Sequence, residues 1–140
     1  MKTYALDTNI ISYFLKGNAE IAEKIAAENS SGNTFVVPPI VYYEINNWLL
    51  KNNSISRSAI FKKIYSVNGI GEITKEALDI ASSIYDKLRK GGKIIETADI
   101  LIAAWCVKNG YILVSNNPKH FIAIEELQVE NWLEGNSTFI

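Results

Sequence analysis

Two patterns of apolar residues alternate along the chain. Short aliphatic or β-branched runs are typical of buried strands, and longer stretches with an apolar residue every three or four positions are typical of amphipathic helices. Strands are predicted at Thr3 to Leu6, Thr34 to Val37, Tyr111 to Val114 and within Gln128 to Asn131, with another short one at Gly69 to Ile73. Helices are predicted from about Ile10 and at Ala19 to Asn29, Ile40 to Lys51, Ser56 to Val67, Thr74 to Lys90 and Thr97 to Asn109.

Strands that alternate with helices in this way predict an α/β fold with a mostly parallel sheet covered on both faces. The last helix is apolar nearly all round, so we expect it in the middle of the domain. No linker, repeat or low-complexity tract interrupts the chain, and residues 1–140 are interpreted as one domain. Ligands of such sheets bind beyond the carboxyl ends of the strands, where Asp7 and the turn at Ser115 are expected.

Composition excludes several classes of protein. Hydrophobic residues make up 48% of the chain and charged residues 21%, which is typical of a globular domain. With 1 Cys and 1 His, a disulfide framework, a Cys-rich zinc cluster and most histidine metal sites are excluded. The longest apolar run, Ile100 to Val107, is far short of the roughly 20 residues that span a bilayer. We therefore expect a cytoplasmic protein with no membrane contact, whose net charge of −1 limits nucleic-acid binding to a local surface.

Three acidic residues stand in unusual positions. Asp7 follows a predicted strand, Glu44 shares a helical stripe with apolar residues, and Asp99 opens the apolar run of the last helix. All three are expected to point toward the interior, where an unpaired carboxylate costs several kcal/mol. Few basic residues are expected nearby to balance the negative charge of these carboxylates. The simplest source of positive charge is a hard divalent cation, Mg²⁺ or Mn²⁺, which prefers oxygen ligands.

Each of these acids also has an ordinary structural interpretation. Asp7 is a good helix N-cap, Glu44 suits an exposed helix position, and Asp99 suits the first turn of a helix. Any one of these interpretations is adequate alone, but the three acids together favour a metal site.

Four segments resemble the PIN-domain ribonucleases, and within them the VapC-type toxins of prokaryotic toxin–antitoxin pairs. The resemblance covers most of the chain, including a closing strand at Leu127 to Trp132, and it is specific because the segments occur in order at the expected separations. The segments are Tyr4 to Asn9, Glu44 after the Pro38-Pro39 turn, Ile95 to Ala104, and Leu113 to Phe121.

The resemblance implies a three-layer α/β/α sandwich and an endoribonuclease that uses Mg²⁺, or Mn²⁺ in its place, to cut RNA, often tRNA or rRNA. Asp7, Glu44 and Asp99 take the positions of the family's first three acids, and Asp7 and Asp99 are expected to hold the principal ion with the help of Glu44. The fourth position, frequently Asp in the family, falls on Asn117, which offers a carbonyl oxygen but no charge.

Three further residues are predicted to support this site. Glu96 lies three positions before Asp99 and could restore the charge missing at Asn117. Asn9 and Ser115 are expected to orient Asp7 and a bound water through hydrogen bonds. Simple turn chemistry is the competing interpretation of both polar residues.

Substrate and partners are predicted from basic and apolar side chains. The basic residues expected to contact RNA are Lys87, Arg89, Lys90 and Lys93, with Lys16, Lys51 and Lys119 as further candidates. Those before Asp99 could equally serve to stabilise a helix C-terminus. The resemblance also implies a homodimer and a VapB-type antitoxin partner. Part of the large apolar surface formed by Tyr42, Tyr43, Trp48 and Leu49 could face that partner, while most of it is expected in the core.

Three alternatives remain open at this point. A haloacid dehalogenase-like phosphatase also begins with an Asp after a strand, but it requires a second Asp where Asn9 stands and Ser or Thr where Ile11 stands. A PIN-like module without activity would bind a partner only, and Asn117 motivates that interpretation. A nuclease that processes RNA without acting as a toxin is the third.

Overall fold

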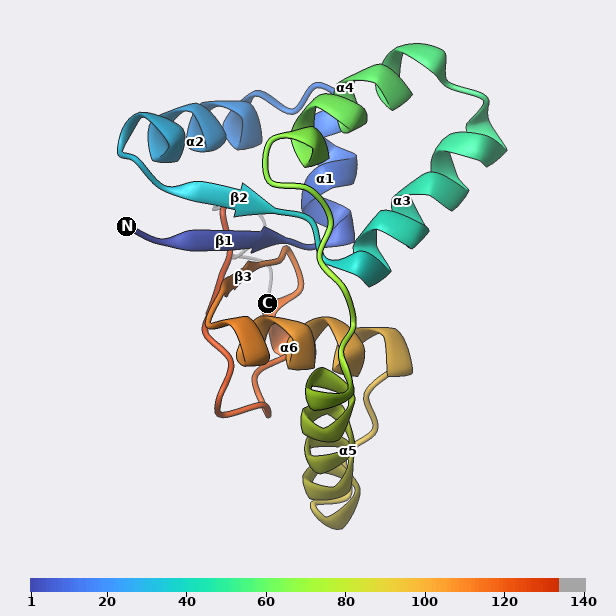
Figure 1. Cartoon of the computed structure of the whole chain (residues 1–140), viewed down its shortest axis with the longest axis vertical. Coiled ribbons are helices and arrows are strands. Elements are labelled where there is room, and N and C mark those ends of the chain that lie inside the picture. Colours follow the sequence, from blue (N-terminus) through green and yellow to red (C-terminus); the bar gives the residue numbers. More distant parts are fainter. Residues whose placement is uncertain (134–140) are drawn as a thin grey trace.

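The computed structural model describes residues 1–133, so residues 134–140 of the predicted domain lie outside the described residues. Within the described part, four strands and six α-helices alternate (Figure 1). The strands are β1 (Thr3–Leu6), β2 (Thr34–Val36), β3 (Ile112–Val114) and β4 (Val129–Glu130). The helices are α1 (Thr8–Leu15), α2 (Ala19–Ser30), α3 (Pro39–Asn52), α4 (Ile55–Ser66), α5 (Lys75–Lys90) and α6 (Thr97–Asn109), with a 3-10 turn η1 (Pro118–His120).

The strands form one sheet in the order β2-β1-β3-β4, and every pairing is parallel. This confirms the predicted parallel α/β sheet. Strand β1 pairs with β2 on one side and with β3 on the other, so the chain changes direction across the sheet between β1 and β3. In open α/β sheets such a switch point, at the carboxyl ends of the strands, is where ligands bind.

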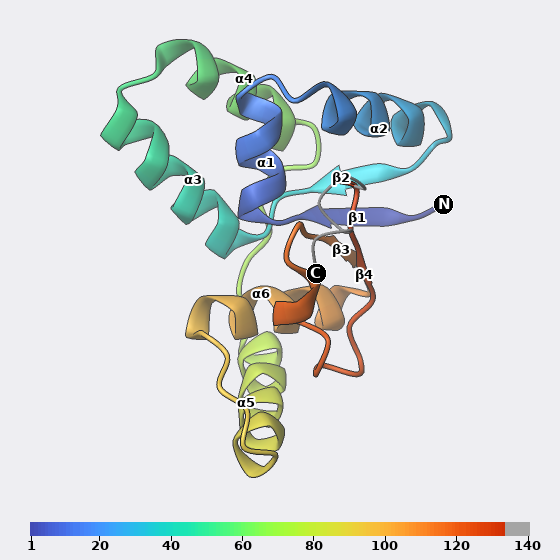
Figure 2. The ribbon, with the colours of Figure 1, turned by 180° about the vertical axis from the view of Figure 1, so that it is seen from behind.

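Helices cover both faces of the sheet, as a three-layer sandwich requires. Helices α1 and α2 lie on one side, and α5 and α6 lie on the other (Figures 1 and 2). Helix α6 is the most buried of them: Ala103 and Cys106 have no exposed surface, which confirms its predicted central place. Ile10 and Ile11 of α1 are fully buried on the opposite face.

Local signals in the sequence explain where the helices begin. Asn18 and Thr74 accept hydrogen bonds from the backbone amides of Ile21 and Ala77, and so cap α2 and α5. Asp7 caps α1, which therefore starts at Thr8, earlier than predicted. None of the helices between residues 1 and 133 is long and apolar enough to cross a membrane.

The predicted strand at residues 69–73 is wrong. Only Ile70 forms an isolated parallel bridge, to Val37, and the rest of the segment runs as an extended connection between α4 and α5 (Figure 1). The segment packs against α6 instead: the indole Nε1 of Trp105 donates a hydrogen bond to the Glu72 carbonyl at 3.2 Å.

The same tryptophan explains why Gly71 is a glycine. A Cβ atom added there would stand 2.6 Å from the buried ring of Trp105. We expect Gly71→Ala to destabilise the fold by about 1–3 kcal/mol, as overpacked cores do, in urea unfolding. Gly91→Ala is the control, because its added Cβ would make only ordinary contacts of 3.5 and 3.6 Å at a negative φ. Equal stability of the two variants would contradict this packing argument.

Candidate active site

Asp7 lies at the carboxyl end of β1, directly beside β3. Its backbone amide donates a hydrogen bond to the Val114 carbonyl at 2.9 Å, which continues the β1–β3 ladder, and its side chain is only 6% exposed. One carboxylate oxygen accepts the Thr8 amide at 2.8 Å, and the other accepts the Ser115 hydroxyl at 2.8 Å. Asp7 is therefore both the cap of α1 and a buried, fully oriented acid.

The turn after β3 is built around this contact. The fully buried Ser115 hydroxyl donates to Asp7 and accepts the Asn117 amide at 3.0 Å. Asn9 accepts the Asn116 amide at 3.1 Å through its side-chain oxygen. The predicted contact of Ser115 with Asp7 is thus present, whereas this hydrogen bond of Asn9 holds the neighbouring turn and not Asp7 itself.

Glu44 reaches the same edge of the sheet from α3. The rigid Pro38-Pro39 pair starts this helix just after β2, so its second turn faces the end of β1. The Thr8 hydroxyl donates a hydrogen bond of 2.5 Å to the Glu44 carboxylate. Glu44 is only half-buried, so the expectation that it points into the interior is corrected: it borders solvent beside Asp7.

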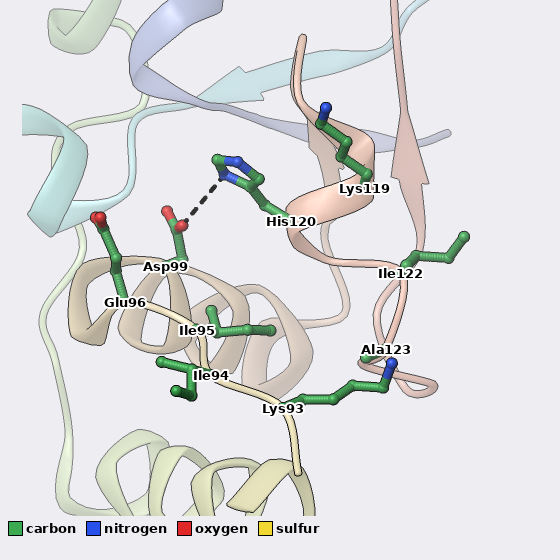
Figure 3. Close-up of a pocket in the computed structure, with 9 residues that line it drawn as sticks. All are labelled: Lys93, Ile94, Ile95, Glu96, Asp99, Lys119, His120, Ile122 and Ala123. Carbon is green, nitrogen blue, oxygen red and sulfur yellow. Dashed lines mark ion pairs between the residues drawn. The ribbon is translucent and has the colours of Figure 1, made fainter. Parts of the chain in front are cut away.

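Asp99 stands in the first turn of α6 and is also half-buried rather than buried. Its Oδ2 lies 3.5 Å from Nδ1 of His120 in η1 (Figure 3). Burial raises the pKa of the Asp99 carboxyl, His120 lowers it, and the charges of Glu96 and Glu44 raise it further. Glu96 is the exposed N-cap residue of α6, so the helix begins too late to place it on a helical face with Asp99, yet its charge acts there.

Electrostatics link the three predicted acids. Burial raises the pKa of Asp7 above its ordinary value; hydrogen bonds from Ser115 and Thr8 lower it, and the charges of Asp99 and Glu44 raise it further. Glu44 raises the pKa of both aspartates and Asp99 raises that of Asp7, so the three acids lie close enough for their negative charges to repel one another. A hard cation with oxygen ligands relieves such repulsion.

The carboxylates do not converge on one point. Within residues 1–133, no three Asp, Glu, His or Cys side chains are arranged as a ready-made metal site. Like charges repel, and each acid is held by a separate donor: Asp7 by Ser115, Glu44 by Thr8, and Asp99 by His120. Shared metal ligation by these acids, with Asn117 beside them, stays a prediction.

A cavity of about 480 Å³ opens beside Asp99 (Figure 3). It is lined by residues 93–96, by Asp99, and by four residues of η1 and the segment after it. Of the four basic residues predicted to contact RNA, Lys93 lines this cavity. The other three pair with acids: Lys87 with Glu126 at 3.7 Å, and Arg89 and Lys90 with Asp86 at 2.8 Å each.

Two residues of the site were not found from the sequence. Thr8 and His120 lie within the segments Tyr4 to Asn9 and Leu113 to Phe121, but neither is among the residues predicted to support the acids. The signal for Thr8 is its place next to Asp7 at a strand end. The signal for His120 is the Pro118 that follows Asn117, since proline favours a tight turn and returns the chain toward the sheet edge.

A family model described as the PIN domain matches residues 4–127. The chain belongs to the PIN domain family. It is 31% identical over 134 residues to "Ribonuclease VapC2" of Haemophilus influenzae, a match that covers 95% of this chain and all of the relative. These findings confirm the resemblance to VapC-type PIN-domain ribonucleases that the four sequence segments carry.

Solved structures agree with this assignment. VapBC2 from Rickettsia felis, in complex with a DNA fragment from its promoter, contains a chain with a TM-score of 0.83 and 27% identity, covering 93% of this PIN domain and 98% of that chain. A chain of DNA-bound VapBC from Salmonella typhimurium has a TM-score of 0.81 at 22% identity and covers 94% and 99%. Because its sequence identity is low, this second match supports the fold alone, which is the three-layer PIN architecture.

Stability of this PIN domain should depend on the charge of Asp7. A raised folded-state pKa means that the folded state holds the proton more tightly than the unfolded chain, so stability falls as pH rises through the interval above the ordinary Asp pKa. Asp7→Asn removes this penalty, and we expect its Tm in chelator at pH 7 to exceed that of wild type, at about 3 °C per kcal/mol. The gain should shrink as the pH falls toward 3, and a pH-independent difference in calorimetry would contradict this explanation.

Proposed function

We propose that this PIN domain is a metal-dependent endoribonuclease that acts as the toxin of a toxin–antitoxin pair. The observation that carries the proposal is the coupled acid cluster of Asp7, Glu44 and Asp99 at the switch point between β1 and β3. Its support is the similarity, over nearly the whole chain, to a protein named Ribonuclease VapC2. tRNA and rRNA are the proposed substrates.

Asp7 and Asp99 are proposed to hold a Mg²⁺ ion, for which Mn²⁺ can substitute, and Glu44 to aid its binding. The oxygen-only donor set and the repulsion between the acids fit a hard cation. Such an ion, when bound, supplies Lewis acidity and lowers the pKa of a bound water. Ser115 keeps Asp7 oriented and favours its ionised form, because a hydroxyl donor stabilises a carboxylate more than a carboxylic acid.

The proposed reaction is hydrolysis of a phosphodiester bond. A water oxygen forms a bond to phosphorus, the bond from phosphorus to the 3′ oxygen breaks, and the leaving oxygen takes a proton. Glu44 stands at the solvent border of the cluster, where its free oxygen can orient the attacking water. The products would carry 5′-phosphate and 3′-hydroxyl ends, whereas a 2′,3′-cyclic phosphate would indicate attack by the RNA itself.

Cleavage of total RNA in Mg²⁺ or Mn²⁺ tests this proposal. We expect discrete fragments that disappear when a chelator is added. For Asp99→Asn we expect the cleavage rate to fall at least about 100-fold, because removing the charge of a metal ligand lowers activity at least as much as removing a residue that orients the ligand. Asp79→Asn is the matched control, an exposed aspartate on α5 that pairs with Lys75. Undiminished cleavage by Asp99→Asn would refute the proposed site.

Glu96 is proposed to add charge to the site in place of the amide at Asn117. Because Glu96 is exposed and acts through space, we expect Glu96→Gln to weaken Mn²⁺ binding by only about two- to fivefold in isothermal titration calorimetry. Glu76→Gln is the control, since Glu76 also lies at the start of a helix but on α5. Equal Mn²⁺ affinity for wild type and Glu96→Gln would remove Glu96 from the site.

A VapB-type antitoxin and a second copy of the chain are the proposed protein partners. The structural relative from Rickettsia felis is a VapBC complex. Of the predicted contact residues, Leu49 is buried and Tyr42 packs against Phe61, while Tyr43 on α3 is 64% exposed. The exposed side of the α3–α4 pair is therefore the surface that we propose for the antitoxin. Growth arrest on expression, relieved by co-expression of the antitoxin, would separate a toxin from an RNA-processing nuclease.

One observation favours a second candidate function. The acids are not arranged as a ready-made metal site within residues 1–133, and the fourth family position holds an amide. A PIN module that binds partners without cutting RNA would show both features. Metal binding by wild type with no RNA cleavage under any condition would favour this candidate.

A further inference from the structure

Thr8 is the first residue of α1, and it contacts two of the three acids. Its backbone amide donates a hydrogen bond to Asp7 Oδ1 at 2.8 Å. Its side-chain hydroxyl donates a second one to Glu44 Oε1 at 2.5 Å, across 36 positions of the sequence. Because Asp7 stands at the end of β1 and Glu44 on α3, this one residue joins acids that come from different elements.

The backbone of Glu44 is fixed by its helix, but its side chain is less constrained. Val41 and Ile45 of the same helix have no exposed surface, so they anchor α3 in the core. The Glu44 side chain is half-buried, and a glutamate has several rotatable bonds that keep alternative rotamers accessible beside solvent. The packing of α3 therefore brings this acid near the cluster without choosing the direction of its carboxylate.

Electrostatic repulsion drives that carboxylate away from the other two acids. The charge of Glu44 raises the pKa of Asp7 and also that of Asp99, so the three groups lie close to one another. Turning toward water would relieve this repulsion, since water and salt screen the charges. The Thr8 hydroxyl opposes such a turn, because a hydrogen bond to an ionised acceptor is stronger than one between neutral groups.

We propose that Thr8 is a positioning residue whose hydroxyl holds Glu44 in the acid cluster, with the second carboxylate oxygen directed toward a bound cation and the attacking water. The inference rests on the proposed ribonuclease function and adds to it a residue that acts through Glu44. In this scheme Thr8 contacts neither the ion nor RNA. Loss of a residue that orients a metal ligand typically lowers metal affinity or activity by about 10- to 100-fold.

The start of α1 does not depend on this hydroxyl. Asp7 supplies the side-chain oxygen that caps the helix, and Thr8 contributes its backbone amide, which any residue except proline would supply. Thr8→Val removes the hydroxyl but keeps that amide and nearly the same side-chain shape. The variant therefore separates the contact with Glu44 from the formation of the helix, and circular dichroism should show it folded.

A double-mutant cycle tests the inference, with Mn²⁺ as the probe in isothermal titration calorimetry. We expect Thr8→Val to weaken Mn²⁺ binding about tenfold when Glu44 is present. In the Glu44→Ala background the same change should cost less than about twofold, because no carboxylate is left to position. Thr8→Ser should recover most of the affinity, since its hydroxyl can donate the same hydrogen bond.

Thr97→Val is the matched control for this cycle. Thr97 is the first residue of α6, as Thr8 is of α1, but its side chain is exposed. We expect the control to bind Mn²⁺ as wild type does. An equal loss of affinity in Thr97→Val and Thr8→Val would show that valine at the start of a helix causes the effect, and it would overturn the inference.

Cleavage kinetics give a second readout. Thr8→Val should lower kcat about tenfold and leave KM for RNA nearly unchanged, because Glu44 is proposed to orient the water after RNA is bound. A rise in KM with unchanged kcat would place Thr8 in RNA binding, and it would contradict the role proposed for the hydroxyl.

The outcomes separate this inference from the proposed function. If wild type cuts RNA and Thr8→Val costs the same with and without Glu44, only the inference fails. If Mn²⁺ binding shows the coupling but wild type never cuts RNA, the proposed nuclease fails while the positioning role stands. If Glu44→Ala alone changes neither Mn²⁺ affinity nor cleavage, Thr8 has no acid to position and the inference is overturned. Absence of Mn²⁺ binding by wild type would refute both.

Discussion

The pairing of β1 with β3 is the contact on which the site depends. It places Leu6 opposite Val114, so the next residues, Asp7 and Ser115, meet at the same edge although 108 positions separate them in the sequence. Because Ser115 is fully buried and Asp7 nearly so, their hydrogen bond cannot be replaced by one to water without disturbing the core. The fold brings the acid and its donor together, and their bond in turn fixes the end of the sheet.

The sequence predicted correctly most features that depend on residues close together along the chain, and it missed several that depend on residues far apart. Helix α6 is predicted at its observed bounds, because its long apolar run and the terminal Gly110 are local signals. The strand predicted at residues 69–73 is wrong, and the contact that this segment makes with Trp105 joins residues more than 30 positions apart. Asp7 was correctly placed at a strand end, but its burial beside partly exposed Glu44 and Asp99 required the packing of α3 and α6 against the sheet edge.

The contact of His120 with Asp99 also could not be predicted from the sequence. Neither residue signals the other in the sequence, and their proximity follows from two turns, η1 and the start of α6, that meet only in the folded chain. For the basic residues, the sequence gives their positions along the chain but not their partners. Lys87, Arg89 and Lys90 shortly precede Asp99 in the sequence, but only the structure shows that acids pair with them and that Lys93 and Lys119 line the cavity.

Asp7 also explains how a fold tolerates a buried acid at this position. A carboxylate that served only a ligand would impose its full desolvation cost on folding. Here the same group caps α1 through the Thr8 amide and anchors the turn after β3 through Ser115, so its two oxygens stabilise two elements. The remaining penalty, expressed in the raised pKa, is the part that those hydrogen bonds leave uncompensated. A residue that conflicts with its surroundings in this way is typical of a functional site, where local stability is given up for chemistry.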